Sequence, residues 1–140
     1  MFTPISMRSE NSYRSVAIET SVSTADPHEL VSLLFEALLQ SLVAAKGAMQ
    51  SGDIQSKGRS IGKSVRIIEE GLKAGLDDAR GGELAANLRA LYDFSILRIT
   101  EANLHNDASA IDEVIKTIQP VAEGWRQIRA QVAGNGRPLQ

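Results

Sequence analysis

Cysteine is absent from this chain of 140 residues, and aromatic residues make up only 4% of it. The absence of cysteine excludes disulfide bonds and thiolate metal sites, and it fits a reducing compartment. No stretch approaches the roughly 18 apolar residues that a membrane span needs. Residues 1–15 also lack the apolar core, about 7–15 residues long, of a secretory signal. We therefore expect neither stable membrane insertion nor secretion through a signal peptide.

The chain also lacks an excess of charge of either sign. Its formal net charge is −2, its pI is about 5.7, and charges of both signs are mixed along the sequence. Proteins that bind nucleic acid or anionic membrane surfaces usually carry an excess of positive charge. We expect neither of these partners.

Strand-like alternation is absent as well, while alanine, leucine and isoleucine are plentiful, so helical periodicity dominates. The most apolar stretch, residues 24–49, begins with a helix start signal. Asp26 is a good N-cap, Pro27 suits the first helical position, and Glu29 stands three residues after the cap. We expect a helix over residues 27–50.

That helix carries two apolar rows when its residues are placed about 100° apart around the axis. One row contains Leu30, Leu34, Ala37, Leu38 and Ala45, and the second contains Phe35, Leu39 and Val43. An ordinary amphipathic helix has one such row and a polar back. Two interpretations follow: this is the most buried helix of a bundle, or its second row lines a groove for another apolar helix.

Three further helices are expected over residues 54–76, 83–104 and 108–132, separated by breaks at 51–53, 77–82 and 105–107. Such short connections place successive helices side by side and antiparallel. The predicted fold is all-α: an antiparallel up-down-up-down four-helix bundle with a short N-terminal arm or helix. We expect one domain over residues 1–140, with loose tails at 1–12 and 134–140.

Each of these helices has an apolar stripe that we expect to face the core. The stripes are Ile54, Ile61, Val65, Ile68, Leu72 and Leu76; then Leu84, Leu88, Leu91, Tyr92, Ile99 and Ala102; and finally Ile111, Val114, Ile115, Ile118, Val121, Trp125, Ile128 and Val132. Helix 83–104 has a second row of Ala86, Ala90, Phe94, Leu97 and Leu104. Pro120 should bend the last helix or remove one of its hydrogen bonds. The glycines at 58, 62 and 71 either permit close helix approach or leave helix 54–76 soft.

Surplus apolar rows on two helices indicate a protein that holds another helix. We predict that the groove residues are Phe35, Leu39, Val43, Phe94 and Leu97. Residues 13–20 form a short segment whose Tyr13, Val16 and Ile18 need an apolar surface. This segment is either packed permanently on its own bundle or a detachable arm that covers a groove.

No catalytic or metal-binding constellation is visible. The only histidines, His28 and His105, lie far apart and lack metal-ligand spacing. No glutamate has a histidine three residues later, as a di-metal helix bundle requires, and no serine has G-x-S-x-G context. We expect no enzyme activity and no cofactor.

The order of several short blocks resembles the flagellar secretion chaperone family FliS, over most of the chain from Tyr13 to Trp125. The blocks are TADPHELV at 24–31, LFE at 34–36, GDI at 52–54, IIE at 67–69, LD at 76–77, GGELAANL at 81–88, LYDF at 91–94, ANL at 102–104, ND at 106–107, EV at 113–114 and Trp125. Departures are small: Asp26 replaces a common serine, Ala37 a common glycine, and Phe35 and Phe94 common tyrosines.

The resemblance implies an antiparallel four-helix bundle without enzyme activity that works in the bacterial cytosol. It implies binding of the disordered C-terminal segment of flagellin, prevention of its premature polymerisation, and delivery to the flagellar type III export apparatus. It also implies that the arm with Tyr13 covers part of the binding surface and assists recognition by the export gate protein.

Three alternatives stay open at this point. The chain could be a type III chaperone for another helical cargo, or a structural homodimer in which the surplus rows meet each other or the N-terminal arm swaps. An enzyme or metal-binding bundle is the third, although the sequence offers no ligands for it.

Overall fold

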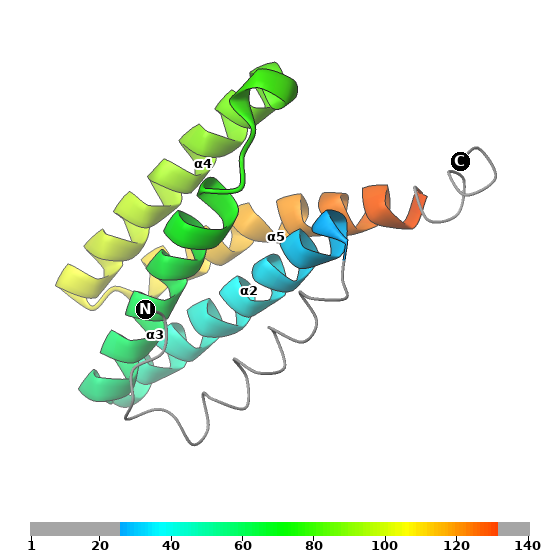
Figure 1. Ribbon diagram of the computed structural model, residues 1–140. Coiled ribbons are helices and arrows are strands. Elements are labelled where there is room, and N and C mark those ends of the chain that lie inside the picture. The colour runs from blue at the N-terminus through cyan, green and yellow to red at the C-terminus, as the bar shows by residue number, and fades with distance from the viewer. Residues whose placement is uncertain (1–25, 132–140) are drawn as a thin grey trace.

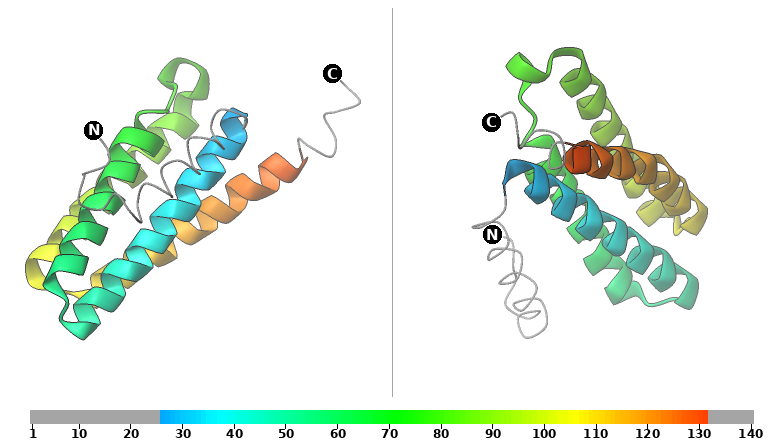
Figure 2. Two further views of the ribbon diagram at one scale, coloured as in Figure 1. Left: turned by 60° about the horizontal axis from the view of Figure 1, so that its bottom comes forward. Right: turned by 90° about the vertical axis from the view of Figure 1, so that its right-hand side faces the viewer.

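Residues 26–131 are described by a computed structural model, and within them the chain is helical and without strands. The helices are α2 (Pro27–Ser51), α3 (Ile54–Arg66), which continues into the π-helical segment η2 (Ile67–Lys73), α4 (Asp78–His105) and α5 (Ala108–Gln131). Figures 1 and 2 show successive helices running antiparallel. The all-α, up-down-up-down four-helix bundle is confirmed. The predicted arm lies outside the described residues, and the single-domain prediction stays a prediction.

The helices form a ring in which each contacts its two neighbours. α2 packs against α3 and α5, and α4 packs against α5 and the α3–η2 helix. Among the described helices, the backbones of α2 and α4 do not come close to each other, so these two helices lie on a diagonal of the bundle. Between them sits one core, whose fully buried large side chains include Leu38, Leu42, Ile68, Ile99, Ile111 and Ile118.

Local signals mark the start of α2 and the first connection. The Asp26 side chain accepts a hydrogen bond from the Glu29 N–H at 2.7 Å, which caps α2. Gly52 ends the helix in the left-handed region at φ 76°, where a glycine has no Cβ penalty. Asp53 then caps α3 by accepting from the Ser56 N–H at 3.1 Å.

The connection between the second and third helices differs from the expected loop at 77–82. The α-helical part of the second helix ends at Arg66, and a π-helix carries it to Lys73. Asp77 caps a new turn by accepting from the N–H groups of Ala79 and Arg80, so α4 starts five residues before the predicted residue 83. Gly82, at φ 53° and ψ −126°, then breaks the helix direction. The cap therefore starts a turn that the glycine separates from the rest of α4.

Gly71 is the glycine of this helix that permits close approach. A Cβ at Gly71 would lie 3.1 Å from both methyl groups of Leu34 in α2. Gly58 has open space instead, and a Cβ at Gly62 would meet only the end of the Arg66 side chain at 3.8 Å. Close packing thus explains one of the three glycines.

α2 is long and apolar enough to cross a membrane, by length and composition alone. Within the bundle, its Leu38, Leu42 and Ala45 are completely buried against the other helices. A core helix of a bundle passes the same test of length and composition.

Candidate functional site

The predicted groove row of α2 is divided between core and surface. Val43 is 59% exposed and Leu39 is partly buried, but Phe35 is only 3% exposed and belongs to the core. The prediction of Phe35 as a surface groove residue is therefore wrong for the described chain. Its position follows from packing, because α2 contacts α3, η2 and α5 and buries more than one row.

The other two predicted groove residues lie on α4 and are exposed. Phe94 and Leu97 are 45% and 57% exposed, and Leu104 further along the helix is 76% exposed. They lie on the side of α4 opposite to its buried Tyr92 and Ile99, and we call these three residues the α4 outer stripe. Because α2 and α4 lie on a diagonal, the structure does not bring Leu39 and Val43 together with this stripe.

A second apolar surface arises where α4 faces α5. One α4 row, spaced four and three residues alternately, consists of Leu84, Leu88, Leu91, Ser95, Arg98 and Ala102. At its C-terminal end this row meets α5, since Arg98 Nη2 lies 2.9 Å from Glu113 Oε1 and Ala102 is buried. At its N-terminal end, Leu84 is 62% exposed. The row is therefore packed against α5 at its C-terminal end and exposed at its N-terminal end.

The matching row of α5 shows the same change. It runs through Ala110, Glu113, Thr117, Val121, Gly124 and Ile128, with Ala110 buried and Ile128 47% exposed. Ile54, Leu84 and Ile128 were all predicted to face the core, and the structure exposes them. For Leu84 and Ile128, the physical reason is the divergence of the two helices, which Figures 1 and 2 both show between the start of α4 and the end of α5. Ile54 is the first residue of α3, at the end of the helix, and its side chain is 76% exposed.

The Arg98–Glu113 contact fixes which residues of the antiparallel pair oppose each other. Counting backwards along α4 and forwards along α5 pairs Leu91 with the Val121 region and Leu84 with the Ile128 region in register, while the two helices separate toward these ends. We call the exposed and partly buried apolar side chains there, with Trp125 beside them, the α4–α5 face: Leu84, Leu88, Leu91, Val121, Trp125 and Ile128. The sequence stripes contained these residues, but nothing in their spacing indicated that the helices separate.

Uncharged residues border this face. One helical step outward stand Asn87 and Phe94 on α4, and Pro120 and Gln127 on α5. The Arg98–Glu113 ion pair closes the packed end, and the Glu113 carboxylate raises the pKa of the Arg98 guanidinium above its ordinary value. Phe94 borders the α4–α5 face and also belongs to the α4 outer stripe, so it connects these two surfaces.

Trp125 is held in place by the first turn of α2. Its ring stacks on the ring of His28, with centroids 4.3 Å apart and an interplanar angle of 17°. Its Nε1–H donates a hydrogen bond to the His28 carbonyl oxygen at 3.0 Å. These contacts hold the C-terminal half of α5 against α2. They do not involve the side of α5 that is turned toward α4.

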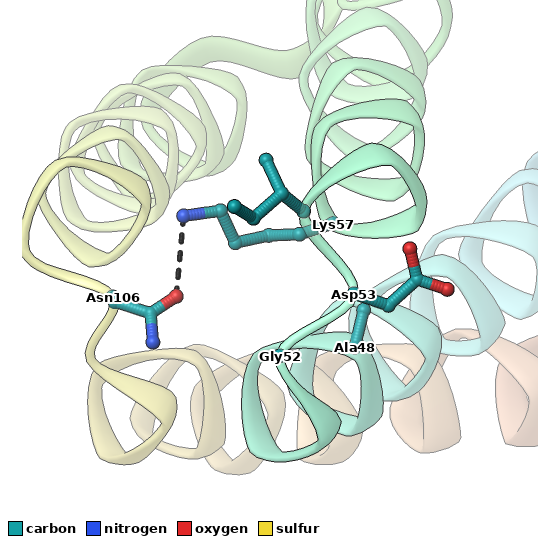
Figure 3. A pocket seen from close by; sticks show the side chains of 6 residues that line it. Ala48, Gly52, Asp53, Lys57 and Asn106 are labelled. Carbon is teal, nitrogen blue, oxygen red and sulfur yellow. Dashed lines mark hydrogen bonds between the residues drawn. The ribbon is translucent and has the colours of Figure 1, made fainter.

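A small pocket of about 270 Å³ lies at the opposite end of the bundle, lined by Ala48, Gly52, Asp53, Ile54, Lys57 and Asn106. Lys57 Nζ donates to the Asn103 carbonyl at 3.3 Å. It also donates to Asn106 Oδ1 at 3.1 Å, the hydrogen bond that Figure 3 shows. Asp53 accepts from Ser56. The hydrogen bonds of Lys57 link the start of α3 to the connection between α4 and α5. No cluster of three potential metal ligands occurs among residues 26–131.

Comparison with known families gives one match over most of the chain. Residues 9–132 match the family described as Flagellar protein FliS. The match includes every described helix in full, and it extends into the region before α2.

Individual relatives agree with this match. The chain is 46% identical over 116 residues to the flagellar secretion chaperone FliS of Salmonella typhimurium, covering 83% of this chain and 86% of the relative. It is 46% identical over 119 residues to the flagellar secretion chaperone FliSB of Pseudomonas aeruginosa, covering 85% and 94%. The Bacillus subtilis FliS is 32% identical over 109 residues, covering 78% and 80%.

Proposed function

This chain belongs to the FliS family of flagellar secretion chaperones, and on that basis we propose that its cargo is the C-terminal segment of flagellin. In this proposal the chain binds the segment in the cytoplasm, prevents its premature polymerisation and delivers it to the flagellar type III export apparatus. The family is a chaperone family and not an enzyme class. A chaperone of flagellar secretion requires a substrate partner, and a surface that binds an apolar segment meets this need.

The observation that carries the proposal is the α4–α5 face. Leu84 and Ile128 are large aliphatic side chains, 62% and 47% exposed, on the facing rows of two diverging helices. Such exposed apolar side chains gathered between two helices mark a place for a partner. An amphipathic helix placed there would supply the apolar cover that each row loses as the helices separate.

Coupled folding supplies the mechanism. The C-terminal segment of flagellin is disordered before assembly in this proposal, and it loses conformational entropy when it orders on the chaperone. A wide apolar contact must offset that loss, and the burial of apolar surface gives the binding a negative heat-capacity change. While the segment is bound, its own apolar side chains are covered and cannot pair with another flagellin.

A segment that covers more than one face would also use the predicted residues outside the α4–α5 face. Phe94 and Leu97 continue the apolar surface along α4, and Leu39 and Val43 offer a separate contact on α2. Disordered partners can wrap surfaces that a folded domain cannot reach together. The predicted arm residues, Tyr13, Val16 and Ile18, lie outside the described residues. Their covering of the surface and their part in recognition by the export gate stay within this proposal.

One substitution separates binding from folding. Leu84→Asp adds a charge to an already exposed position, so it should change the urea midpoint little and weaken binding of the flagellin C-terminal peptide by at least about tenfold. Ile54→Asp is the matched control, because Ile54 is 76% exposed at the other end of the bundle. Isothermal titration with the flagellin of the same genome measures the binding of both variants. Absence of binding by the wild-type chain, or equal binding by Leu84→Asp, would contradict the proposal.

Self-association is a second candidate, and the α4 outer stripe favours it. Phe94, Leu97 and Leu104 form an exposed apolar row on which a second copy could pack. Sedimentation over a concentration series, with and without the flagellin peptide, distinguishes the two. A dimer that the peptide does not dissociate would support a structural homodimer.

A further inference from the structure

We propose that His28 is a positioning residue of the α4–α5 face: by stacking on Trp125 it holds the C-terminal half of α5 against α2, and so keeps the face open for a bound segment. This inference rests on the proposed function, because it concerns how the same surface is kept available. His28 lies on α2, whose backbone does not come close to α4, so it acts on the face through α5.

The open α4–α5 face is an arrangement that apolar burial alone does not favour. Leu84 is 62% exposed and Ile128 is 47% exposed, on the parts of α4 and α5 that diverge in Figures 1 and 2. Movement of the end of α5 toward the start of α4 would remove such side chains from water, which is favourable. Contacts elsewhere in the bundle must therefore hold the two helices apart.

On α5, the contact that opposes this movement is made by Trp125. Its ring stacks on that of His28 with centroids 4.3 Å apart, and its Nε1–H donates to the His28 carbonyl oxygen at 3.0 Å. Both contacts are made to the first turn of α2, which the Asp26 side chain caps at 2.7 Å. Trp125 stands three residues before Ile128, so the restraint acts on the part of α5 that diverges from α4.

On α4, an ion pair with a different neighbour provides the corresponding restraint. Lys73 Nζ of η2 lies 2.7 Å from Asp93 Oδ1 of α4, and the hydrogen bond to the Asp93 carboxylate raises the pKa of the Lys73 ammonium above its ordinary value. The adjacent Tyr92 is buried in the core. Thus α4 is held to η2 while α5 is held to α2, and the space between their diverging ends is kept.

His28 contributes a flat ring and a backbone carbonyl to this restraint. Its Nδ1 atom is buried and has no hydrogen-bond partner among the described residues, so the side chain acts at this atom as a stacking surface and not as a donor or acceptor. The carbonyl belongs to the backbone and remains after any substitution at residue 28. Substitution of the side chain therefore removes the stack and leaves the acceptor of the indole hydrogen bond in place.

Distances within the free chain test the restraint without any cargo. The chain contains no cysteine, so Ala86→Cys on α4 and Gln127→Cys on α5 place a pair of spin labels at exposed positions and nowhere else. In this labelled chain, His28→Ala should shift the distance distribution to shorter values, because the end of α5 can move toward α4. His28→Phe keeps a flat ring and should retain the distribution of the unsubstituted labelled chain.

Binding of the flagellin C-terminal peptide, measured by isothermal titration without the labels, is the second readout. His28→Ala should weaken binding at least about fivefold, and His28→Phe should retain most of it. Ser64→Ala is the matched control, because it removes a buried hydroxyl that pairs with Ser41 and not with any residue of the face. It should leave the label distances and the dissociation constant unchanged. Should His28→Ala not fold, His28→Leu, which has no flat ring, takes its place.

Unchanged label distances in His28→Ala would overturn the inference. An equal loss of binding in His28→Ala and Ser64→Ala would also overturn it, since the loss would then follow from general destabilisation. If the distances shorten as expected but the folded wild-type chain binds no flagellin peptide, the restraint by His28 is supported and the proposed function fails.

Discussion

Trp125 and His28 lie 97 residues apart in sequence but join the last helix to the first turn of α2 by two contacts. Their rings stack with centroids 4.3 Å apart, and the indole N–H donates to the His28 carbonyl oxygen at 3.0 Å. That carbonyl lies in the first turn of α2, after Pro27. The pair therefore fixes the end of α5 without using its α4 side.

Replacement of Trp125 by phenylalanine should destabilise the chain by about 1–2 kcal/mol. Phenylalanine keeps a ring for the stack but cannot donate the hydrogen bond, whose net worth is of order 1 kcal/mol, and it buries less area. Urea unfolding followed by far-UV circular dichroism measures the loss. His28→Ala keeps the carbonyl acceptor and should cost less; a larger loss for His28→Ala would show that the stack matters more than the hydrogen bond.

Two buried serines should respond to alanine in opposite directions. Ser64 Oγ lies 2.7 Å from Ser41 Oγ and donates to the Ser60 carbonyl at 2.9 Å, so Ser64→Ala should cost about 1 kcal/mol. Ser95 Oγ is buried without a hydrogen-bond partner among the described residues. Ser95→Ala removes that cost and favours the helix, and it should be neutral or stabilising by up to about 1 kcal/mol. Equal losses in a urea melt would refute this difference.

The stability contribution of Asp107 should depend on pH in a defined direction. Hydrogen bonds from Ser109, and from the Ala110 N–H, hold the pKa of this carboxyl below its ordinary value of 3.8. Since the folded pKa is the lower one, the contribution is present above the unfolded pKa and is lost as the pH falls through the folded pKa. Asp107→Ala should thus melt at a lower temperature than the wild-type chain at pH 7, and the difference should shrink below pH 3.8. A difference that persists unchanged at low pH would contradict this account.

Helix identity and order could be predicted because their signals are local. Asp26 caps α2 as predicted, and Gly52 and Asp53 end one helix and begin the next within the predicted break at 51–53, through a φ angle and a hydrogen bond. Asp77 shows the limit of such signals. A break was expected at 77–82, but the cap that Asp77 provides is sufficient for a helical turn before Gly82.

The surface residues could be predicted less well, because the spacing of apolar residues along a helix carries no information about the angle between two helices. Leu84 and Ala102 belong to one row, yet Leu84 is exposed and Ala102 is completely buried. Only the divergence of α4 from α5 distinguishes them. Phe35 failed for the opposite reason, since α2 has neighbours on several sides and buries a row that looked surplus.

The central claim is that the chain captures a disordered flagellin segment by folding it on the α4–α5 face. Titration of the flagellin C-terminal peptide into the full chain, at several temperatures, with heat and far-UV circular dichroism recorded, tests it most directly. The account predicts saturable binding, a gain of helix beyond the sum of the two components and a negative heat-capacity change, because apolar surface is buried as the segment orders. A folded chain that shows no binding, or binding without a gain of helix, would contradict it.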